Sequence, residues 1–166
     1  MRVPIRKADK YTHLKTDPYI TQAKFDELTK KVDRLINVNR PREAEEVKRL
    51  ALMGDFSENV GYQIAKGRLR GINQRVLDIQ DLLKNAIIIR HDKNNEIVQI
   101  GNFVTLSRDG REKEYQILGS EETNPTAGVI SHHSPLGSAL IGRKIGDEIE
   151  VNLDDRVIKY KIIKIN

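Results

Sequence analysis

The sequence predicts an α plus α+β protein, in which an N-terminal antiparallel two-helix coiled coil precedes a small α+β domain. In residues 19–90, hydrophobic residues recur at alternating intervals of three and four, which is the spacing of an apolar stripe along a helix. After residue 90 the interval changes to two, the period of half-buried strands. Residues 1–18 show neither period, so we predict a poorly ordered extension there. The expected regions are therefore residues 1–18, 19–90 and 91–166.

The first helix of the hairpin is predicted to begin after Thr21, a good N-cap residue. A hydrophobic stripe follows it but has a gap between residues 39 and 42. Pro41 lies in that gap and removes a helical hydrogen bond, so we expect a kink or local unwinding there. The stripe consists of Phe25, Leu28, Val32, Leu35, Ala44, Val47 and Ala51.

The chain is predicted to reverse at residues 54–59, which read Gly-Asp-Phe-Ser-Glu-Asn. Glycine can end a helix, and Asp55 and Ser57 are candidate N-caps for the next helix. The return helix, expected to extend to residue 90, has an unbroken seam that packs against the first helix. Its seam residues are Tyr62, Ala65, Leu69, Ile72, Val76, Ile79 and Leu83.

The C-terminal domain is predicted from two β-hairpins and one short helix. The first hairpin turns at residues 108–111, which contain Asp-Gly, and the second turns at residues 154–155. A short helix is expected over residues 135–142, between Pro and Gly. The boundary with the coiled coil is placed in the polar residues 91–95. The predicted strands are residues 103–106, 115–118, 127–131, 148–151 and 157–163.

The composition excludes several classes of protein. The 166 residues are 38% hydrophobic and include no cysteine, which excludes a disulfide framework, a Cys nucleophile and a thiolate zinc site. The longest aliphatic run, Ala86–Ile89, is too short to span a bilayer, and the charged N-terminus lacks the apolar stretch of a signal peptide. We therefore expect a cytoplasmic protein with no membrane association.

Asp55 and Glu58 are the clearest candidates for chemistry. They are three residues apart at a helix start, so both carboxylates can face one side of the hairpin tip. Paired oxygen ligands suit Mg²⁺, which usually takes one or two protein carboxylates and completes its shell with water or phosphate. The same pair is also ordinary helix-start chemistry, an N-cap Asp followed by a first-turn Glu. The residues alone leave both interpretations open.

Basic residues follow the tip on the return helix. The net charge of +5 is concentrated in the first 90 residues, which hold 19 Lys and Arg against 12 Asp and Glu. Lys66, Arg68 and Arg70 are therefore candidates for contacts to phosphates that do not depend on base sequence. The alternative is an exposed coiled-coil flank that pairs with acidic residues of the first helix. Those residues are Glu43, Glu45 and Glu46.

Other polar residues give weaker signals. His132 and His133 are adjacent, and adjacent side chains on a strand point to opposite faces. With no third ligand visible, both are interpreted as structural or exposed. Ser57 and Ser138 lack the surroundings of a nucleophile, so nothing indicates an independent hydrolase.

Two motifs resemble the GreA/GreB family of bacterial transcript cleavage factors. The first is residues 54–59 (GDFSEN) with Tyr62, and the second is residues 134–142 (SPLGSALIG) with residues 146–147 (GD). The resemblance covers the chain from residue 19 onward and is somewhat closer to the GreB branch. It implies that the C-terminal domain is FKBP-like. It also implies that RNA polymerase is the partner, with the hairpin in its secondary channel and the C-terminal domain docked at the rim.

The resemblance further implies a role in rescuing backtracked polymerase. Such a factor is not an enzyme itself but makes the active site of the polymerase cut the extruded RNA 3′ end. Asp55 and Glu58 would act as catalytic residues that help to hold the second Mg²⁺ of a two-metal hydrolysis, while the polymerase supplies the other ligands. We expect a monomer that does not bind Mg²⁺ tightly on its own. Lys66, Arg68 and Arg70 are predicted to contact the RNA, and docking is assigned to Ser134, Pro135, Leu136, Ala139 and Leu140.

Two positions depart from the family pattern. Gly61 stands where many members carry an acidic residue, and Ser138 stands where the docking helix usually carries a basic one. The first departure leaves open a Gre-like regulator that occupies the channel without stimulating cleavage, although the Asp55 and Glu58 pair favours cleavage. A third alternative is a coiled-coil module that binds RNA or protein without any catalytic role.

Overall fold

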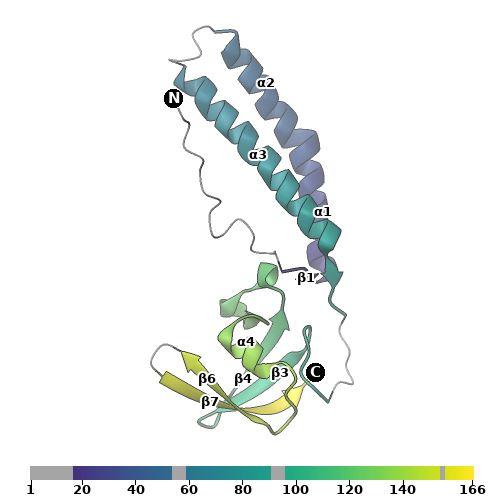
Figure 1. Cartoon of the computed structure of the whole chain (residues 1–166), viewed down its shortest axis with the longest axis vertical. Helices are drawn as coiled ribbons and strands as arrows, with labels where there is room; N and C mark the ends of the chain where they lie inside the picture. The colour runs from purple at the N-terminus through teal and green to yellow at the C-terminus, as the bar shows by residue number, and fades with distance from the viewer. Residues whose placement is uncertain (1–16, 54–58, 91–95, 154–155) are drawn as a thin grey trace, which may run out of the picture.

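The structure is a computed structural model that describes residues 17–53, 59–90, 96–153 and 156–166. A helical hairpin stands on a curled β-sheet domain, and the first short strand lies between them (Figure 1). This arrangement confirms the predicted fold class. None of the helices in the described part of the chain has an apolar stretch long enough to cross a bilayer.

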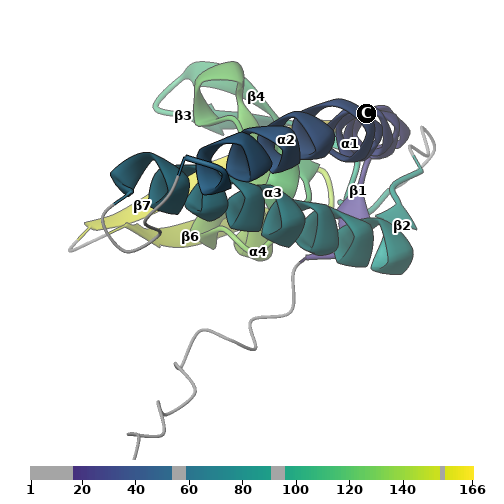
Figure 2. The same ribbon diagram turned by 90° about the horizontal axis from the view of Figure 1, so that it is seen from above.

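Two antiparallel helical arms form the hairpin. The first arm contains α1 (Gln22–Arg34), a π-helical turn (Leu35–Asn39) and α2 (Arg40–Ala51), and the second arm is α3 (Val60–Asn85). Seen from above, the first arm lies alongside α3 over the C-terminal domain (Figure 2). Thr21 caps α1 as predicted, because its hydroxyl oxygen accepts a hydrogen bond from the Lys24 N–H at 3.2 Å.

The irregularity expected around Pro41 lies slightly earlier in the chain, at residues 35–39. Pro41 has no N–H, so a regular helix would leave the carbonyl four residues before it without a donor. In the structure the Arg40 N–H bonds to the Leu35 carbonyl, five residues back, which is the π-helical pattern. The helical arm therefore continues through the proline with one widened turn and does not unwind.

Burial confirms the predicted seam of α3. All seven seam residues are buried or half-buried, and Ala65 and Val76 are the most buried among them. In the first arm the prediction fails at Ala44, which is exposed, while Glu43 takes the half-buried position beside it. The π-helical turn explains this difference, because an extra residue in one turn changes which positions of α2 face α3.

A two-stranded parallel sheet closes the base of the hairpin. In it, β1 (Tyr19–Ile20) pairs with β2 (Ile87–Ile88). The return helix was expected to reach residue 90 but ends at Asn85, because the residues that follow pair with β1. The β-branched isoleucines suit this extended backbone. Ile20 is fully buried there, together with Leu28 of α1 and Leu82 of α3.

The C-terminal domain is a five-stranded sheet with the strand order β5-β4-β3-β7-β6. Both predicted hairpins are present, and the first turns through Asp109 and Gly110, whose positive φ angles of 51° and 75° are typical of a tight hairpin turn. The elements are β3 (Phe103–Arg108), β4 (Arg111–Leu118), the 3-10 turns η2 (Ser120–Glu122) and η3 (Pro125–Ala127), β5 (Val129–Ser131), α4 (Pro135–Leu140), β6 (Glu148–Leu153) and β7 (Arg156–Ile165).

The hydrophobic core of this domain lies between the curled sheet and α4. Leu106, Ile117 and Ile162 from the sheet and Leu140 from α4 are at most 1% exposed. Removing these side chains from water is the main stabilisation that the domain has. The domain is therefore a compact base, and the hairpin extends from it with a much thinner apolar interface.

Candidate functional site

Asn59 holds the two helix ends together at the hairpin tip. Its side-chain oxygen accepts a hydrogen bond from the Tyr62 N–H at 3.0 Å, and its amide nitrogen donates to the Leu50 carbonyl at 3.1 Å. One side chain thus caps α3 and binds the end of α2. Asp55 and Ser57 were predicted as caps, and that prediction is wrong because α3 begins later, at Val60.

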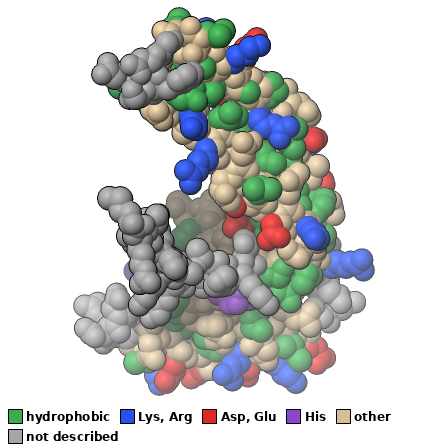
Figure 3. Space-filling view, turned by 45° about the horizontal axis from the view of Figure 1, so that its top comes forward, with side chains coloured by type: hydrophobic (Ala, Val, Ile, Leu, Met, Phe, Trp, Pro, Cys, Tyr) green, Lys and Arg blue, Asp and Glu red, His purple; other side chains and the backbone are tan. Residues whose placement is uncertain are grey.

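Asp55 and Glu58 lie outside the described residues, so their predicted role in metal binding stays a prediction. The chain on both sides of them exposes large hydrophobic side chains. Leu52 is 81% exposed, Met53 65% and Val60 69%. Hydrophobic side chains are accordingly visible at the upper end of the space-filling view (Figure 3). The described tip therefore presents a largely apolar surface around the connecting residues.

Gly61 lies directly against the cap made by Asn59. A Cβ atom at Gly61 would lie 3.3 Å from the Asn59 side-chain oxygen and 3.6 Å from a methyl group of Leu50. A larger residue would require a small displacement of this oxygen or of its helix end. The glycine at this departure from the family pattern therefore has a local packing reason.

Lys66, Arg68 and Arg70 are all exposed, but they do not share one face of α3. A helix advances about 100° per residue, so Lys66 and Arg70 lie on one flank of the seam and Arg68 on the other. The Lys66 ammonium lies 5.8 Å from the centroid of the Tyr62 ring, a cation–π contact on the side toward the tip. The predicted basic stripe is thus divided between two flanks.

Arg68 faces the first arm and lines a shallow groove with Glu46 and Arg49 of α2. Arg49 donates two hydrogen bonds of 2.8 Å to Glu46. These bonds lower the pKa of the Glu46 carboxyl, and the charge of Arg68 adds to the effect. Within the described residues, no ion pair within 4.0 Å joins a basic residue of α3 to an acidic residue of α2.

The N-terminus of α4 is fixed by Ser134. Its hydroxyl donates to the Ser131 carbonyl at 2.6 Å and accepts from the Gly137 N–H at 3.0 Å. A Cβ atom at Gly137 would overlap the Ser131 carbonyl oxygen, so only glycine allows α4 to approach β5 this closely. The motif that suggested a docking segment therefore also has a structural role.

Burial divides the five residues predicted to dock onto polymerase. Leu140 is fully buried in the domain core, so the prediction that it contacts a partner is wrong. Leu136 and Ala139 are half-buried against the same core, and Ser134 is half-buried as the cap. Pro135 is exposed and is the member of the set most open to a partner.

A buried carboxylate joins the segment before β1 to the C-terminal domain. Asp17 accepts hydrogen bonds from the Ser120 N–H at 2.8 Å, the Ser120 hydroxyl at 2.9 Å and the Tyr19 N–H at 3.1 Å. Burial raises the pKa of Asp17, but these hydrogen bonds outweigh burial and lower the pKa below its ordinary value. The carboxylate is therefore ionised at neutral pH.

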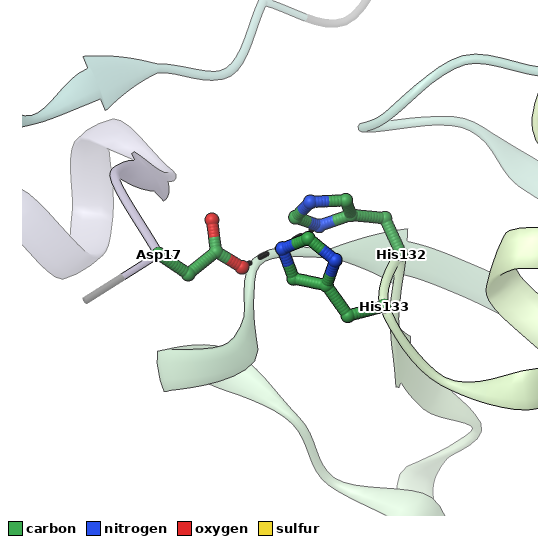
Figure 4. A group of neighbouring side chains, drawn as sticks. All are labelled: Asp17, His132 and His133. Atoms are coloured by element: carbon green, nitrogen blue, oxygen red, sulfur yellow. Dashed lines mark ion pairs between the residues drawn. The ribbon is translucent and has the colours of Figure 1, made fainter. Parts of the chain in front are cut away.

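His132 and His133 lie together beside Asp17 (Figure 4). Their ring centroids are 3.9 Å apart, and His132 Nδ1 is 3.4 Å from the nearer Asp17 oxygen. The expectation that the two rings point to opposite faces is wrong, because β5 ends at Ser131 and the histidines occupy the turn after it. Asp17 is so distant in sequence that no spacing motif indicates this cluster.

A second contact at the same junction involves Glu122 of η2. Its carboxylate accepts hydrogen bonds from the Thr21 N–H at 2.7 Å and from the Thr21 hydroxyl at 2.6 Å. Gly119 permits the approach, since a Cβ atom there would overlap the Tyr19 carbonyl oxygen. Residues 17–21 are therefore fixed to the C-terminal domain by hydrogen bonds and by close backbone packing.

Comparison with known proteins gives matches along nearly the whole chain. A family model described as "Transcription elongation factor, N-terminal" matches residues 18–88, and one described as "Transcription elongation factor, GreA/GreB, C-term" matches residues 93–166. These two ranges correspond to the hairpin with its base and to the C-terminal domain.

Individual relatives agree with the family models. The transcription elongation factor GreA of Macrococcus caseolyticus is 39% identical over 150 residues, covering 89% of this chain and 95% of the relative. The protein of the same name from Clostridium acetobutylicum is 39% identical over 149 residues, covering 88% and 94%. The crystal structure of GreA factor homolog 1 from Thermus thermophilus is 23% identical over 89% of this chain and 97% of its own, with a TM-score of 0.40.

Proposed function

The chain belongs to the GreA/GreB family of transcription elongation factors, and from this premise we propose that it binds RNA polymerase and stimulates cleavage of backtracked RNA by the polymerase active site. The observation that supports this most directly is that both family models match in tandem, each on its own structural region. In the proposed complex the hairpin enters the secondary channel, and the C-terminal domain docks at the rim. The factor acts on elongation and leaves the chemistry to the polymerase.

The tip is proposed to supply Asp55 and Glu58 to that active site. Their carboxylate oxygens are the ligands that Mg²⁺ prefers, and two of them are too few to hold the ion tightly in the free factor. When bound, Mg²⁺ would supply the activation of the attacking water. Asn59 supports this role because it joins the ends of both helices next to the residues that bear the carboxylates.

The flank that carries Lys66 and Arg70 is proposed to contact the extruded RNA 3′ end. The two residues lie one turn apart, and Lys66 is oriented toward the tip through Tyr62. Arg68 is on the other flank, near Glu46, and is expected to contribute less. We propose that the factor acts as a monomer, because the apolar seam of each helical arm is already paired with the other arm.

Docking is proposed to use the exposed surface of α4, with Pro135 as its centre. The buried Leu140 and the cap of Ser134 would hold this surface in shape without touching the partner. A compact domain suits this role because its backbone is fixed before binding, which lowers the entropic cost of association.

The test is an RNA cleavage assay on a stalled, backtracked elongation complex, with and without the factor. Replacing Asp55→Asn together with Glu58→Gln gives the carboxylate variant, which we expect to lose about 100-fold or more of the stimulated rate. Asp78→Asn together with Asp81→Asn is the matched control. These two carboxylates are exposed, and they are three residues apart like Asp55 and Glu58, but they lie in the part of α3 near the base of the hairpin. The control is expected to behave like the wild type.

Three results would contradict parts of this proposal. Cleavage by the carboxylate variant at the wild-type rate would remove the metal-holding role. Binding of the wild type to polymerase without any cleavage would instead indicate a regulator that occupies the channel. If the wild type showed no affinity for polymerase, the proposed function as a whole would be wrong.

A further inference from the structure

We propose that Asp17, His132 and His133 form a binding site for a transition-metal dication of the Zn²⁺ class, separate from the tip. Each of the three offers a possible ligand atom, and these atoms all lie within 4.8 Å of one another. Figure 4 shows both imidazole rings on the same side of the turn after β5, next to the Asp17 carboxylate. This cluster is independent of the proposed function, because none of these three residues has a role in polymerase binding or RNA cleavage there.

The donor set determines which ion the site would take. Two imidazole nitrogens and one carboxylate oxygen are a ligand set that Zn²⁺ uses when three protein groups bind it and a water takes the fourth position. Imidazole suits Zn²⁺, Ni²⁺ and Cu²⁺, whereas Mg²⁺ prefers oxygen ligands alone. The site is therefore expected to select transition metals and to discriminate against the ion proposed at the tip.

Hydrogen bonds position this site before any ion binds. Asp17 is fixed by Ser120 and Tyr19, and its side chain is only 5% exposed. The Ser131 hydroxyl oxygen accepts the His133 N–H at 3.1 Å and lies 3.1 Å from the Ser120 hydroxyl. One network therefore connects the backbone of the histidine turn to the carboxylate. Because a buried carboxylate is poorly screened by water, its attraction for a cation is strengthened.

Metal binding requires the loss of one proton and the rotation of one ring. Ligands of a tetrahedral Zn²⁺ lie about 2.0–2.1 Å from the ion and therefore about 3.4 Å from one another. His132 Nδ1 already lies 3.4 Å from the Asp17 carboxylate oxygen. The same nitrogen lies 3.3 Å from the Leu118 carbonyl, which can only accept a hydrogen bond, so an ion bound at Nδ1 would replace the proton shared with that carbonyl. His133 is the exposed member of the cluster, so its ring can rotate to complete the site.

An ion at this position would bridge the two regions of the molecule. Asp17 lies two residues before β1, which forms the base of the hairpin with β2. The two histidines lie directly before Ser134, the cap of α4. Binding of the ion is therefore expected to stabilise the junction and to raise the melting temperature of the protein.

The experiment is a calorimetric titration of the tag-free, full-length protein with Zn²⁺ alone. We expect one ion per chain, and we expect His133→Gln to weaken the affinity at least about tenfold. This variant leaves the buried contact between Asp17 and His132 in place, so it is expected to fold. His91→Gln is the control, because it removes a histidine that is not part of the proposed site, and it should bind like the wild type.

A spectroscopic measurement adds a second criterion. Co²⁺ in place of Zn²⁺ should give the visible absorption of a tetrahedral site in the wild type and lose it in His133→Gln. No stoichiometric binding by the wild type would overturn the proposal. Equal affinity of the wild type and His133→Gln would also overturn it, as would loss of binding in His91→Gln alone, which would assign the ion to another histidine.

Discussion

Along its 26 residues, α3 of the hairpin buries Ala65, Val76 and Leu82, whereas nine buried hydrophobic residues form one cluster in the C-terminal domain. A helix in a two-helix hairpin can cover only one narrow stripe, so most of its surface meets solvent. A sheet that curls around a helix removes most of its inner face from solvent. The difference agrees with the division of tasks proposed above, in which the hairpin provides reach and the domain provides a fixed docking surface.

The contrast is strongest between the two ends of the molecule. At the base, hydrogen bonds between residues 17–21 and η2 join the hairpin to the domain, and the buried Ile20 packs between the two helical arms. At the tip, Leu52, Met53 and Val60 are exposed and Asn59 provides the cross-link between the arms. Local stability therefore decreases from the base toward the tip, where the carboxylates are proposed to act.

The largest effect on stability is expected from the core of the C-terminal domain. Leu140→Ala removes a fully buried side chain and should lower the free energy of unfolding by about 2–5 kcal/mol. Leu69→Ala changes a half-buried seam position of α3 and should cost about half as much or less. Urea denaturation followed by circular dichroism measures both. Equal losses of unfolding free energy in the two variants would contradict the greater stabilisation expected from the domain core.

A smaller effect is expected at the junction. Glu122→Ala removes the acceptor of two hydrogen bonds from Thr21 and should cost about 1.5–3 kcal/mol of unfolding free energy. Glu121→Ala is the matched control, since this neighbouring residue is exposed, and it should stay within about 0.5 kcal/mol of the wild type. If both variants had the same stability in urea denaturation, the Thr21 contact would not help to hold the regions together.

The two flanks of α3 are expected to contribute unequally to RNA cleavage. Lys66→Gln together with Arg70→Gln should reduce cleavage of long backtracked RNA several-fold, and should lower the salt dependence of binding by about one unit of slope per residue. Arg68→Gln should have a smaller effect, because this side chain faces Glu46. Cleavage and affinity are measured over a series of salt concentrations. An equal loss of cleavage in the two variants would contradict the assignment of RNA contact to the flank that carries Lys66 and Arg70.

The smallest effect is a gain in stability. A Cβ atom at Gly67 meets nothing within 4 Å, so Gly67→Ala should stabilise the hairpin by about 0.5–1 kcal/mol. In the C-terminal domain Gly137→Ala should destabilise, because its Cβ would overlap the Ser131 carbonyl oxygen. Thermal denaturation measures the change in melting temperature of each variant. If both variants shifted the melting temperature in the same direction, the space for a Cβ atom would not differ between these two positions.

The fold was predictable where one local pattern determined it. The seam of α3 follows from spacings of three and four, and the hairpin turn at Asp109 and Gly110 follows from the need for positive φ. The exposure of Ala44 was not predictable in this way, because the π-helical turn changes the phase of α2. The end of α3 at Asn85 depends on pairing with β1, a contact between segments far apart in the chain.

The residues of the candidate site likewise include some that the sequence indicates and others that only the packing brings together. The motifs at residues 54–59 and 134–142 indicate the family by their residues alone, and the family models agree. The burial of Leu140 and the position of Arg68 depend on how the elements pack. The cluster of Asp17 with the two histidines depends on packing most of all, because its members meet only when the segment before β1 packs against η2 and the turn after β5.

The C-terminal domain is proposed to provide affinity for polymerase and the tip to provide the activity, and a competition experiment separates these two roles. The carboxylate variant is titrated into a cleavage reaction in which the wild type saturates the polymerase. If the variant binds as well as the wild type, the rate should fall to about half when the two are equimolar and continue to fall as the variant increases. A rate that stays unchanged at about tenfold excess of the variant would contradict this proposal, because it would show that Asp55 and Glu58 are needed for binding itself.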